Sequence, residues 1–249
     1  MKIRVKNYKR FILTSTVIAA VCALIIWGAF ALVFKVFKPA AQVRKVDIIQ
    51  PQQTEVVEAE PHTENDLLML VNKDNAIPDG YSPQDLVTVP LDSLRECKLC
   101  KEASDALESL FAGASAQGYS LVCVSGYRDY ASQVDVHNDE ISAYGEEQAD
   151  MTSAPAGYSE HETGLAMDIS SASNDYDLTE AFGTTDEGKW VAAHAAEYGF
   201  IIRYPDGKES ITGYTYEPWH LRYVGKDAAK EITDQNTTLE EYLNSKSSS

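Results

Sequence analysis

The stretch Ser159-Glu160-His161-Glu162-Thr163-Gly164-Leu165-Ala166-Met167-Asp168 decides how the rest of the chain is interpreted. From Leu165 to Ile169, apolar side chains alternate with small or polar ones, and this period of two indicates a half-buried β-strand. The apolar members should face the core, while Asp168 projects from the other face. His161 precedes this strand, separated from it by a turn at Gly164. An imidazole and a carboxylate on rigid, converging backbone are what a zinc site requires, because Zn2+ binds nitrogen and oxygen ligands at about 2.0–2.2 Å.

Two further segments carry side chains of the same kind. The motif Glu217-Pro218-Trp219-His220 lies far downstream and offers a second histidine, with a carboxylate three residues before it. The segment Ser125-Gly126-Tyr127-Arg128 follows a predicted strand from 119 to 124, which would deliver its arginine to the carboxyl end of that strand. A guanidinium in this position can contact a developing oxyanion or a substrate carboxylate.

Together these segments resemble the zinc D-alanyl-D-alanine carboxypeptidases, a family of bacterial cell-wall peptidases that includes the vancomycin-resistance carboxypeptidases and related L,D-carboxypeptidases. The family pattern S-x-H-x-x-G-x-A-x-D followed by E-x-W-H is matched at Ser159, His161, Gly164, Ala166, Asp168, Glu217, Trp219 and His220. Further matches are Leu70-Val71-Asn72-Lys73, Tyr198-Gly199-Phe200 and Arg203-Tyr204-Pro205. The resemblance covers roughly residues 66 to 245.

The resemblance implies a role for each of seven side chains. His161, Asp168 and His220 would be the zinc ligands, and three protein ligands leave the fourth position open, which is the catalytic arrangement. Glu217 would be the general base, and Arg128 would stabilise the transition state. Ser159 and Gln133 are weaker candidates for holding the terminal carboxylate of a peptide. Glu160 and Glu162 are expected to face solvent.

The other three histidines are not expected to bind metal. His62 lies in a polar segment before the domain. His137 falls on an apolar stripe of a helix that begins after Asp129, together with Tyr130, Val134 and Ile141. His194 shares a helical face with Trp190 and Tyr198. Both are interpreted as packed side chains.

The N-terminal part of the chain reads as a membrane anchor and a spacer. Residues 1–10 carry five basic residues and no acid, which predicts a cytoplasmic tail. Residues 11–34 contain no charge and exceed the ~20 residues that span a bilayer, so we expect an uncleaved transmembrane helix. The alternative is a long signal peptide cut near Ala40-Ala41. Residues 35–65 form a polar, acidic tether outside the cell, and residues 66–245 form the catalytic domain.

Charge and cysteine content exclude some other classes of protein. The net charge is −17 and residues 1–38 hold seven positive charges and no acid, which leaves −24 on the exported remainder. Nucleic acid is therefore not an expected partner. Cys97 and Cys100 lack the second cysteine pair of a zinc finger. We expect structural roles, with a disulfide from one of them to Cys123 as a possibility, although sequence cannot fix the pairing.

The order of predicted elements favours an α+β fold, because helices and strands are mixed without regular βαβ alternation. Helices are predicted near 103–114, 130–141, 190–198 and 228–232, with a capping box at Thr237-Thr238-Leu239-Glu240-Glu241. Strands are predicted at 200–203 and 212–216, the latter bending or ending at Pro218. The resemblance implies a small antiparallel sheet flanked by helices, with zinc on its concave face.

The sequence therefore predicts a membrane-anchored zinc carboxypeptidase that removes a terminal D-alanine from peptidoglycan stem peptides. One alternative is a D-Ala-D-Ala dipeptidase, which usually lacks an export segment. The other is a non-catalytic peptidoglycan-binding module of the same fold, which should have lost Glu217 or a ligand, and none is lost. The motifs do not separate D,D- from L,D-cleavage.

Overall fold

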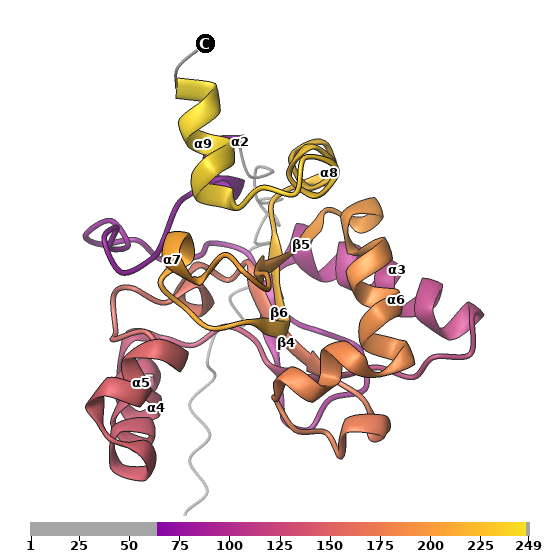
Figure 1. The fold of residues 1–249 in the computed structure, drawn as a ribbon, viewed down its shortest axis with the longest axis horizontal. Coiled ribbons are helices and arrows are strands. Elements are labelled where there is room, and N and C mark those ends of the chain that lie inside the picture. Colours follow the sequence, from indigo (N-terminus) through magenta and orange to yellow (C-terminus); the bar gives the residue numbers. More distant parts are fainter. Residues whose placement is uncertain (1–63, 248–249) are drawn as a thin grey trace, which may run out of the picture. The chain divides into compact units, whose positions relative to one another are not determined.

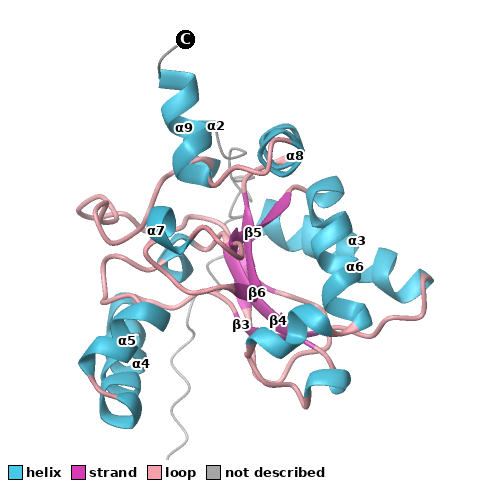
Figure 2. Ribbon diagram, viewed as in Figure 1, coloured by secondary structure: helices cyan, strands magenta, loops and turns pink. Residues whose placement is uncertain are grey.

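The centre of the fold is a four-stranded antiparallel sheet in the order β3-β4-β6-β5 (Figures 1 and 2). The computed structural model describes residues 64–247, which all belong to one compact unit. The strands are Val122–Ser125 (β3), Ala166–Ser170 (β4), Phe200–Tyr204 (β5) and Glu217–Tyr223 (β6). A smaller antiparallel pair joins β1, Leu86–Thr88, to β2, Lys98–Cys100. The predicted α+β class with a small antiparallel sheet is confirmed.

Helices lie on both sides of the main sheet. In Figure 1, α3 (Lys101–Ala116) and α6 (Asp186–His194) lie to one side, while α4 (Tyr130–Tyr144) and α5 (Glu146–Thr152) pack together on the other. The C-terminal helices α8 (Lys226–Asp234) and α9 (Leu239–Ser247) lie beyond β5. The short elements are α2 (Glu64–Leu67), α7 (Glu209–Thr212) and the 3-10 helices η1 (Glu160–Thr163), η2 (Ala172–Asn174), η3 (Glu180–Thr184) and η4 (Ala195–Tyr198).

The strand predicted at the centre of the sequence is β4, and it is buried on both faces rather than one. All five of its residues are buried. Met167 and Ile169 belong to the main apolar core, which also takes in the buried side chains of α3. Asp168 points away from that core, and its face is covered by the elements that carry the candidate site. The alternation was therefore a correct signal for the strand but an incomplete guide to its burial.

The helix α4 begins as predicted but does not bury the predicted stripe. The Asp129 side chain caps it by accepting a hydrogen bond from the Ser132 N–H at 2.8 Å. Tyr130 and Val134 are nevertheless exposed, and Gln133 is the one buried residue of this helix. His137 contacts α5, with Nε2 3.7 Å from Asp150 Oδ1, and so does not pack in the core. The reason is that α4 packs on α5 and turns the face bearing Gln133 towards a cavity.

The strand that carries His220 also differs from prediction. No strand covers 212–216 in the described chain; instead β6 begins at Glu217 and continues through Pro218 to Tyr223. Proline cannot donate to a ladder, but the pairing of β6 with β5 shifts register between Ile202 and Tyr204, opposite this part of β6. The missing N–H is thus accommodated at an irregularity, and the strand continues past the proline to His220.

The predicted disulfide is wrong. Cys97, Cys100 and Cys123 are free and buried, and all three belong to the main apolar core. The sulfur of Cys100 lies 3.7 Å from the Thr163 carbonyl oxygen, at the turn before β4. Burial raises the pKa of the Cys100 thiol to about 12, which suits a packing residue and not a reactive one.

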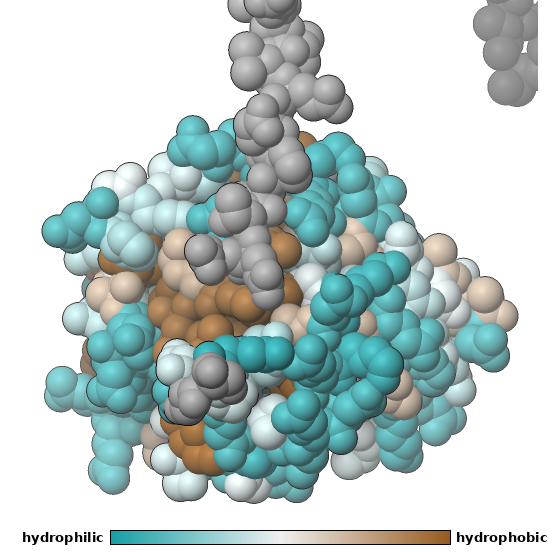
Figure 3. Space-filling view, turned by 90° about the horizontal axis from the view of Figure 1, so that it is seen from above, coloured by the Kyte–Doolittle hydropathy of each residue, from teal (hydrophilic) through white to brown (hydrophobic). Residues whose placement is uncertain are grey.

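Two other predictions near the chain ends have different outcomes. The capping box is confirmed, because Thr238 Oγ1 accepts from the Glu241 N–H at 3.3 Å and Glu241 Oε2 accepts from the Thr238 N–H at 2.9 Å. The transmembrane helix at 11–34 lies outside the described residues, as do the tail before it, nearly all of the tether after it and His62. Within residues 64–247, none of the helices is long and apolar enough to cross a membrane. Figure 3 shows one face of the domain, where mostly hydrophilic residues surround a hydrophobic area.

Candidate active site

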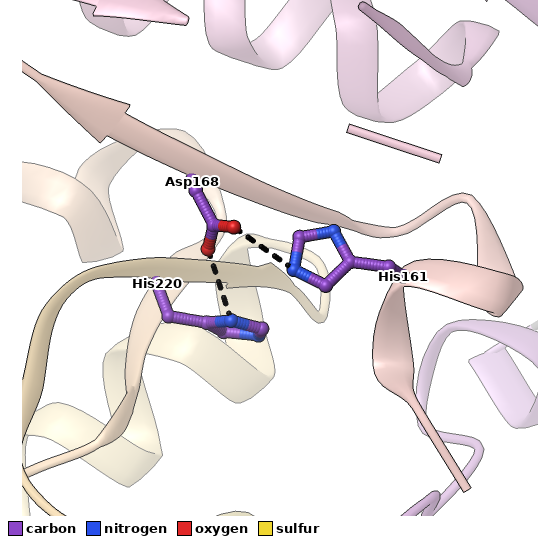
Figure 4. A group of neighbouring side chains, drawn as sticks. All are labelled: His161, Asp168 and His220. Atoms are coloured by element: carbon purple, nitrogen blue, oxygen red, sulfur yellow. Dashed lines mark ion pairs between the residues drawn. The ribbon is translucent and has the colours of Figure 1, made fainter. Parts of the chain in front are cut away.

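The register of the sheet brings two of the three predicted ligands side by side. Asp168 on β4 is paired directly with His220 on β6. His161 reaches them from η1, which is capped by Ser159 and ends at Gly164, a left-handed residue with φ of 73°. The Asp168 carboxylate lies between the imidazoles (Figure 4), with Oδ2 3.2 Å from His161 Nε2 and Oδ1 3.2 Å from His220 Nδ1. All three side chains are buried.

Each imidazole makes a hydrogen bond through the ring nitrogen that does not face Asp168. His161 Nδ1 lies 2.8 Å from the Gly126 carbonyl oxygen, so this nitrogen must carry the proton and donate. His220 Nε2 lies 3.4 Å from Glu160 Oε2 and donates to that carboxylate. The nitrogens left for a ligand are therefore Nε2 of His161 and Nδ1 of His220, and both face Asp168. A partner on the outer nitrogen is what metal-binding histidines usually have.

This donor set fits a divalent metal ion such as zinc. Ligand atoms of His161, Asp168 and His220 all lie within 4.8 Å of one another. Asp168 Oδ1 is buried and has no hydrogen-bond donor in good geometry among the described residues. A buried carboxylate oxygen needs a partner, and a cation would supply one. Two nitrogens and one carboxylate oxygen are ligands that Zn2+ prefers.

The two imidazoles differ in their affinity for protons. Burial, with the nearby Arg128 charge, lowers the pKa of His161 to about 4. Burial also opposes protonation of His220, but the Asp168 and Glu160 carboxylates outweigh it and raise its pKa to about 9. A metal ion that takes the Nδ1 position must therefore displace a proton from His220.

Glu217 is buried at the start of β6, beside the cluster. Its Oε2 lies 3.7 Å from His220 Nδ1. Burial raises the pKa of Glu217 to about 8, with the Asp168 charge adding to the effect and His220 and Arg128 opposing it. A carboxyl group whose pKa is near neutrality can both accept and return a proton, which is what a general base of a hydrolase does.

Arg128 follows β3 and is held at the site by its backbone, whose N–H donates to the His161 carbonyl oxygen at 3.2 Å. Its Nε is buried and has no partner among the described residues. Burial lowers the pKa of this guanidinium, although the charges of Asp168 and Glu217 favour its protonated form. Arginine stays charged in proteins, so Arg128 places a cation next to the cluster, and no ion pair is shown between it and the described residues.

A cavity of about 780 Å³ connects these groups, and its lining includes Arg128, Gln133, Ser159, Glu217 and the three predicted ligands. Gln133 donates from Nε2 to the Ala154 carbonyl oxygen at 2.7 Å, while its Oε1 is buried without a partner. Ser159 Oγ accepts from the His161 N–H at 3.3 Å, so this hydroxyl already has a structural use. All seven predicted site residues are thus brought together around one cavity.

Three residues of the cavity wall were missed or misjudged from sequence. Ser153 and Tyr214 line the cavity with hydroxyl oxygens that have no partner among the described residues, and no motif marks either of them. Glu160 was expected to face solvent, yet its side chain is 0% exposed and is bound by two arginines. Glu162 is buried too, and it accepts from the Gly157 N–H at 2.7 Å. His194 stacks on Trp190 with ring centroids 4.6 Å apart, away from the site, as expected.

Comparison with known proteins places this geometry in a family. Residues 96–226 match the family model VanY, D-alanyl-D-alanine carboxypeptidase. The putative carboxypeptidase YodJ of Bacillus subtilis is 54% identical over 182 residues, which cover 71% of this chain and 67% of that protein. A D-alanyl-D-alanine carboxypeptidase of Enterococcus faecium is 38% identical over 146 residues, which cover 58% of this chain and 44% of that protein.

Solved structures agree with these relatives. The LdcB LD-carboxypeptidase is 52% identical, with a TM-score of 0.68 over 73% of this chain and 87% of that one. A mutant of the vancomycin-resistance D,D-pentapeptidase VanY in complex with Zn(II) is 33% identical, with a TM-score of 0.63 over 72% of this chain and 99% of that one. The matched residues include every predicted site residue, and the chain belongs to the VanY family of D-alanyl-D-alanine carboxypeptidases.

Proposed function

We propose that this protein is a zinc-dependent carboxypeptidase that removes a terminal D-alanine from peptidoglycan stem peptides outside the cytoplasmic membrane. The observation that carries the proposal is the convergence of His161, Asp168 and His220 on one point of a cavity that also holds Glu217 and Arg128. The names of the relatives support the substrate, because they are carboxypeptidases acting on D-alanine or peptidoglycan.

The residues divide the reaction between them. His161, Asp168 and His220 would hold the ion, which supplies Lewis acidity to a bound water and to the scissile carbonyl. Glu217 takes a proton from the attacking water and delivers it to the leaving amine, since its raised pKa allows both transfers near neutral pH. Arg128 stabilises negative charge that develops on the carbonyl oxygen, because its buried Nε has no competing partner in the described chain.

The terminal carboxylate of the peptide needs hydrogen-bond donors. Ser159 and Gln133 were predicted for this role, and both line the cavity. The hydroxyls of Ser153 and Tyr214 supply donors there that have no partner within residues 64–247. Gln133 can offer the second N–H of its Nε2, since the one hydrogen bond shown from this nitrogen goes to the Ala154 carbonyl oxygen. Ser159 Oγ accepts from the His161 N–H where it caps η1, and this leaves its O–H free to donate to the carboxylate.

L,D-cleavage is a second candidate for the specificity. Identity to the LdcB LD-carboxypeptidase is 52%, whereas identity to the D,D-pentapeptidase VanY is 33%. This difference favours tetrapeptide stems over pentapeptide stems as substrates. A D-Ala-D-Ala dipeptidase is less well supported, although a bifunctional dipeptidase and carboxypeptidase of Enterococcus gallinarum is 33% identical. A non-catalytic wall-binding module would have no use for the buried Glu217 and Arg128.

Mass spectrometry of purified muropeptides tests the proposal. Pentapeptide and tetrapeptide stems are incubated separately with the enzyme, and loss of one alanine from either confirms a carboxypeptidase. Loss from the tetrapeptide alone establishes L,D-specificity, and release of intact D-Ala-D-Ala dipeptide would establish the dipeptidase. Stems that remain intact under all conditions would contradict the proposal.

A further inference from the structure

The residue that faces the outer nitrogen of His220 is Glu160, which has no role in the chemistry described above. Its side chain is 0% exposed, although it lies between Ser159 and His161 in a motif where it was expected to face solvent. A buried carboxylate is costly unless it is fully paired. Its partners therefore indicate what holds it there.

One oxygen of Glu160 is taken by two arginines. Oε1 accepts from Arg203 Nε of β5 and from Arg222 Nη1 of β6, both at 2.7 Å. Arg203 also makes a bidentate pair with Glu240 of α9, at 3.0 and 2.6 Å. Two arginines and two glutamates balance in charge.

The other oxygen is left for His220. Oε2 lies 3.4 Å from His220 Nε2 and has no other hydrogen-bond partner shown among the described residues. A carboxylate that accepts from two guanidinium groups has no proton to donate, so Nε2 of His220 carries the proton and Nδ1 faces Asp168. The arginine pair fixes where the carboxylate sits, and the carboxylate fixes which way the imidazole faces.

We infer that Glu160 is a positioning residue for the metal site, which orients His220 through Nε2 so that Nδ1 is available as a ligand. The inference rests on the proposed metal site and adds to it a residue that the motif match does not assign. Arg203 and Arg222 act one step further out, because they bind Glu160 and no hydrogen bond or ion pair links them to His161, Asp168 or His220 among the described residues. Glu240 pairs with Arg203 and makes no hydrogen bond or ion pair with Glu160 in the described chain.

The test compares three variants by zinc affinity, measured in competition with a chromogenic chelator. Glu160→Gln can keep one acceptor for the arginines but then turns its amide N–H towards Nε2, which disfavours the required tautomer. Loss of such an outer partner typically costs about 10–100-fold in metal affinity, and we expect a loss in that range. Cobalt(II) loaded into this variant should also show a visible spectrum different from that of the wild type.

Two controls separate positioning from stability. Glu240→Gln breaks the same buried network beyond Arg203 without touching Glu160, so it should lower the melting temperature and leave zinc affinity unchanged. Glu162→Gln changes a neighbouring buried carboxylate that accepts from the Gly157 N–H, and it too should leave zinc affinity unchanged. If Glu160→Gln binds zinc as tightly as the wild type, the inference is wrong.

A measurement on the wild type covers the case in which Glu160→Gln does not fold. Histidine labelled with 15N in the zinc-loaded full-length protein should show His220 bound through Nδ1, with a proton on Nε2 that exchanges slowly with water. Coordination through Nε2, or a rapidly exchanging Nε2 proton, would overturn the positioning role. A wild type that binds no zinc would instead overturn the proposed function, so the two failures are distinguishable.

Discussion

At the scale of single residues, Glu217 and His220 should be separable although only three positions divide them. His220→Ala removes a ligand and should lose zinc and activity together. Glu217→Gln cannot accept the proton of water, but it keeps its shape and should retain zinc. General acid–base assistance contributes about 10²–10⁴-fold, so its turnover should fall by at least about a hundredfold. Zinc content and turnover are measured on both variants. A zinc-replete Glu217→Gln enzyme with near-normal turnover would remove Glu217 from the mechanism.

Site residues that belong to a motif could be predicted from the sequence. Those whose position depends on contacts with distant parts of the chain could not. His161, Asp168, Glu217 and His220 meet as expected, because the two motifs that carry them resemble those of a zinc carboxypeptidase family, in which these residues share one site. Glu160 gave the opposite impression, since its arginine partners lie 43 and 62 residues downstream. From sequence alone, a charged residue is expected to be exposed unless a residue of opposite charge lies close to it in the chain.

At the scale of elements, β2 packs closely against Gly126, and the Gly126 carbonyl oxygen in turn holds the His161 ring through Nδ1. A Cβ on Gly126 would lie 2.5 Å from the Lys98 carbonyl oxygen, which is backbone and cannot move alone. Gly126→Ala should therefore cost about 1–3 kcal/mol of unfolding free energy, as overpacking does. It should also weaken zinc binding, because the displaced Gly126 carbonyl holds His161 Nδ1. Urea unfolding and chelator competition measure the two effects, and unchanged values for both would show that the contact does not matter.

The C-terminal helix offers a second element-scale prediction. Thr238 caps α9 by accepting from the Glu241 N–H, and its side chain is buried. Thr238→Ala should lower the free energy of unfolding by about 1 kcal/mol, the usual cost of losing an N-cap. Thr238→Ser keeps the hydroxyl and is the matched control. Equal stability of the alanine and serine variants in thermal or urea unfolding would contradict the assignment of the cap.

Sequence patterns located most elements but not their surroundings. The helices near 103–114 and 228–232 are present, and β4 lies where alternation placed it. The stripe of α4 failed because its apolar side chains do not meet the core, while the polar Gln133 is buried against the loop at Ala154. The strand at Pro218 failed because a register shift tolerates the proline. The spacing of apolar residues in the sequence predicts which side chains share a face of a helix or strand. Tertiary contacts determine whether that face is buried and against what.

At the scale of the whole molecule, we propose that residues 11–34 anchor the catalytic domain outside the cell. The basic residues 1–10 would remain in the cytoplasm, as positive charges flanking a membrane span do. Protease added to intact, wall-stripped cells should release a fragment that begins between residues 39 and 65. A catalytic domain that stays protected until the cells are lysed would show that the orientation is reversed.

The most direct test of the account is to measure zinc content and D-alanine release on one preparation of the purified protein. We predict one zinc ion per chain, loss of hydrolysis when a chelator removes it, and recovery when zinc is returned. The melting temperature should fall on removal, because a ligand that binds only the folded state stabilises that state. Full hydrolysis of stem peptides by a preparation shown to be free of metal would contradict the account.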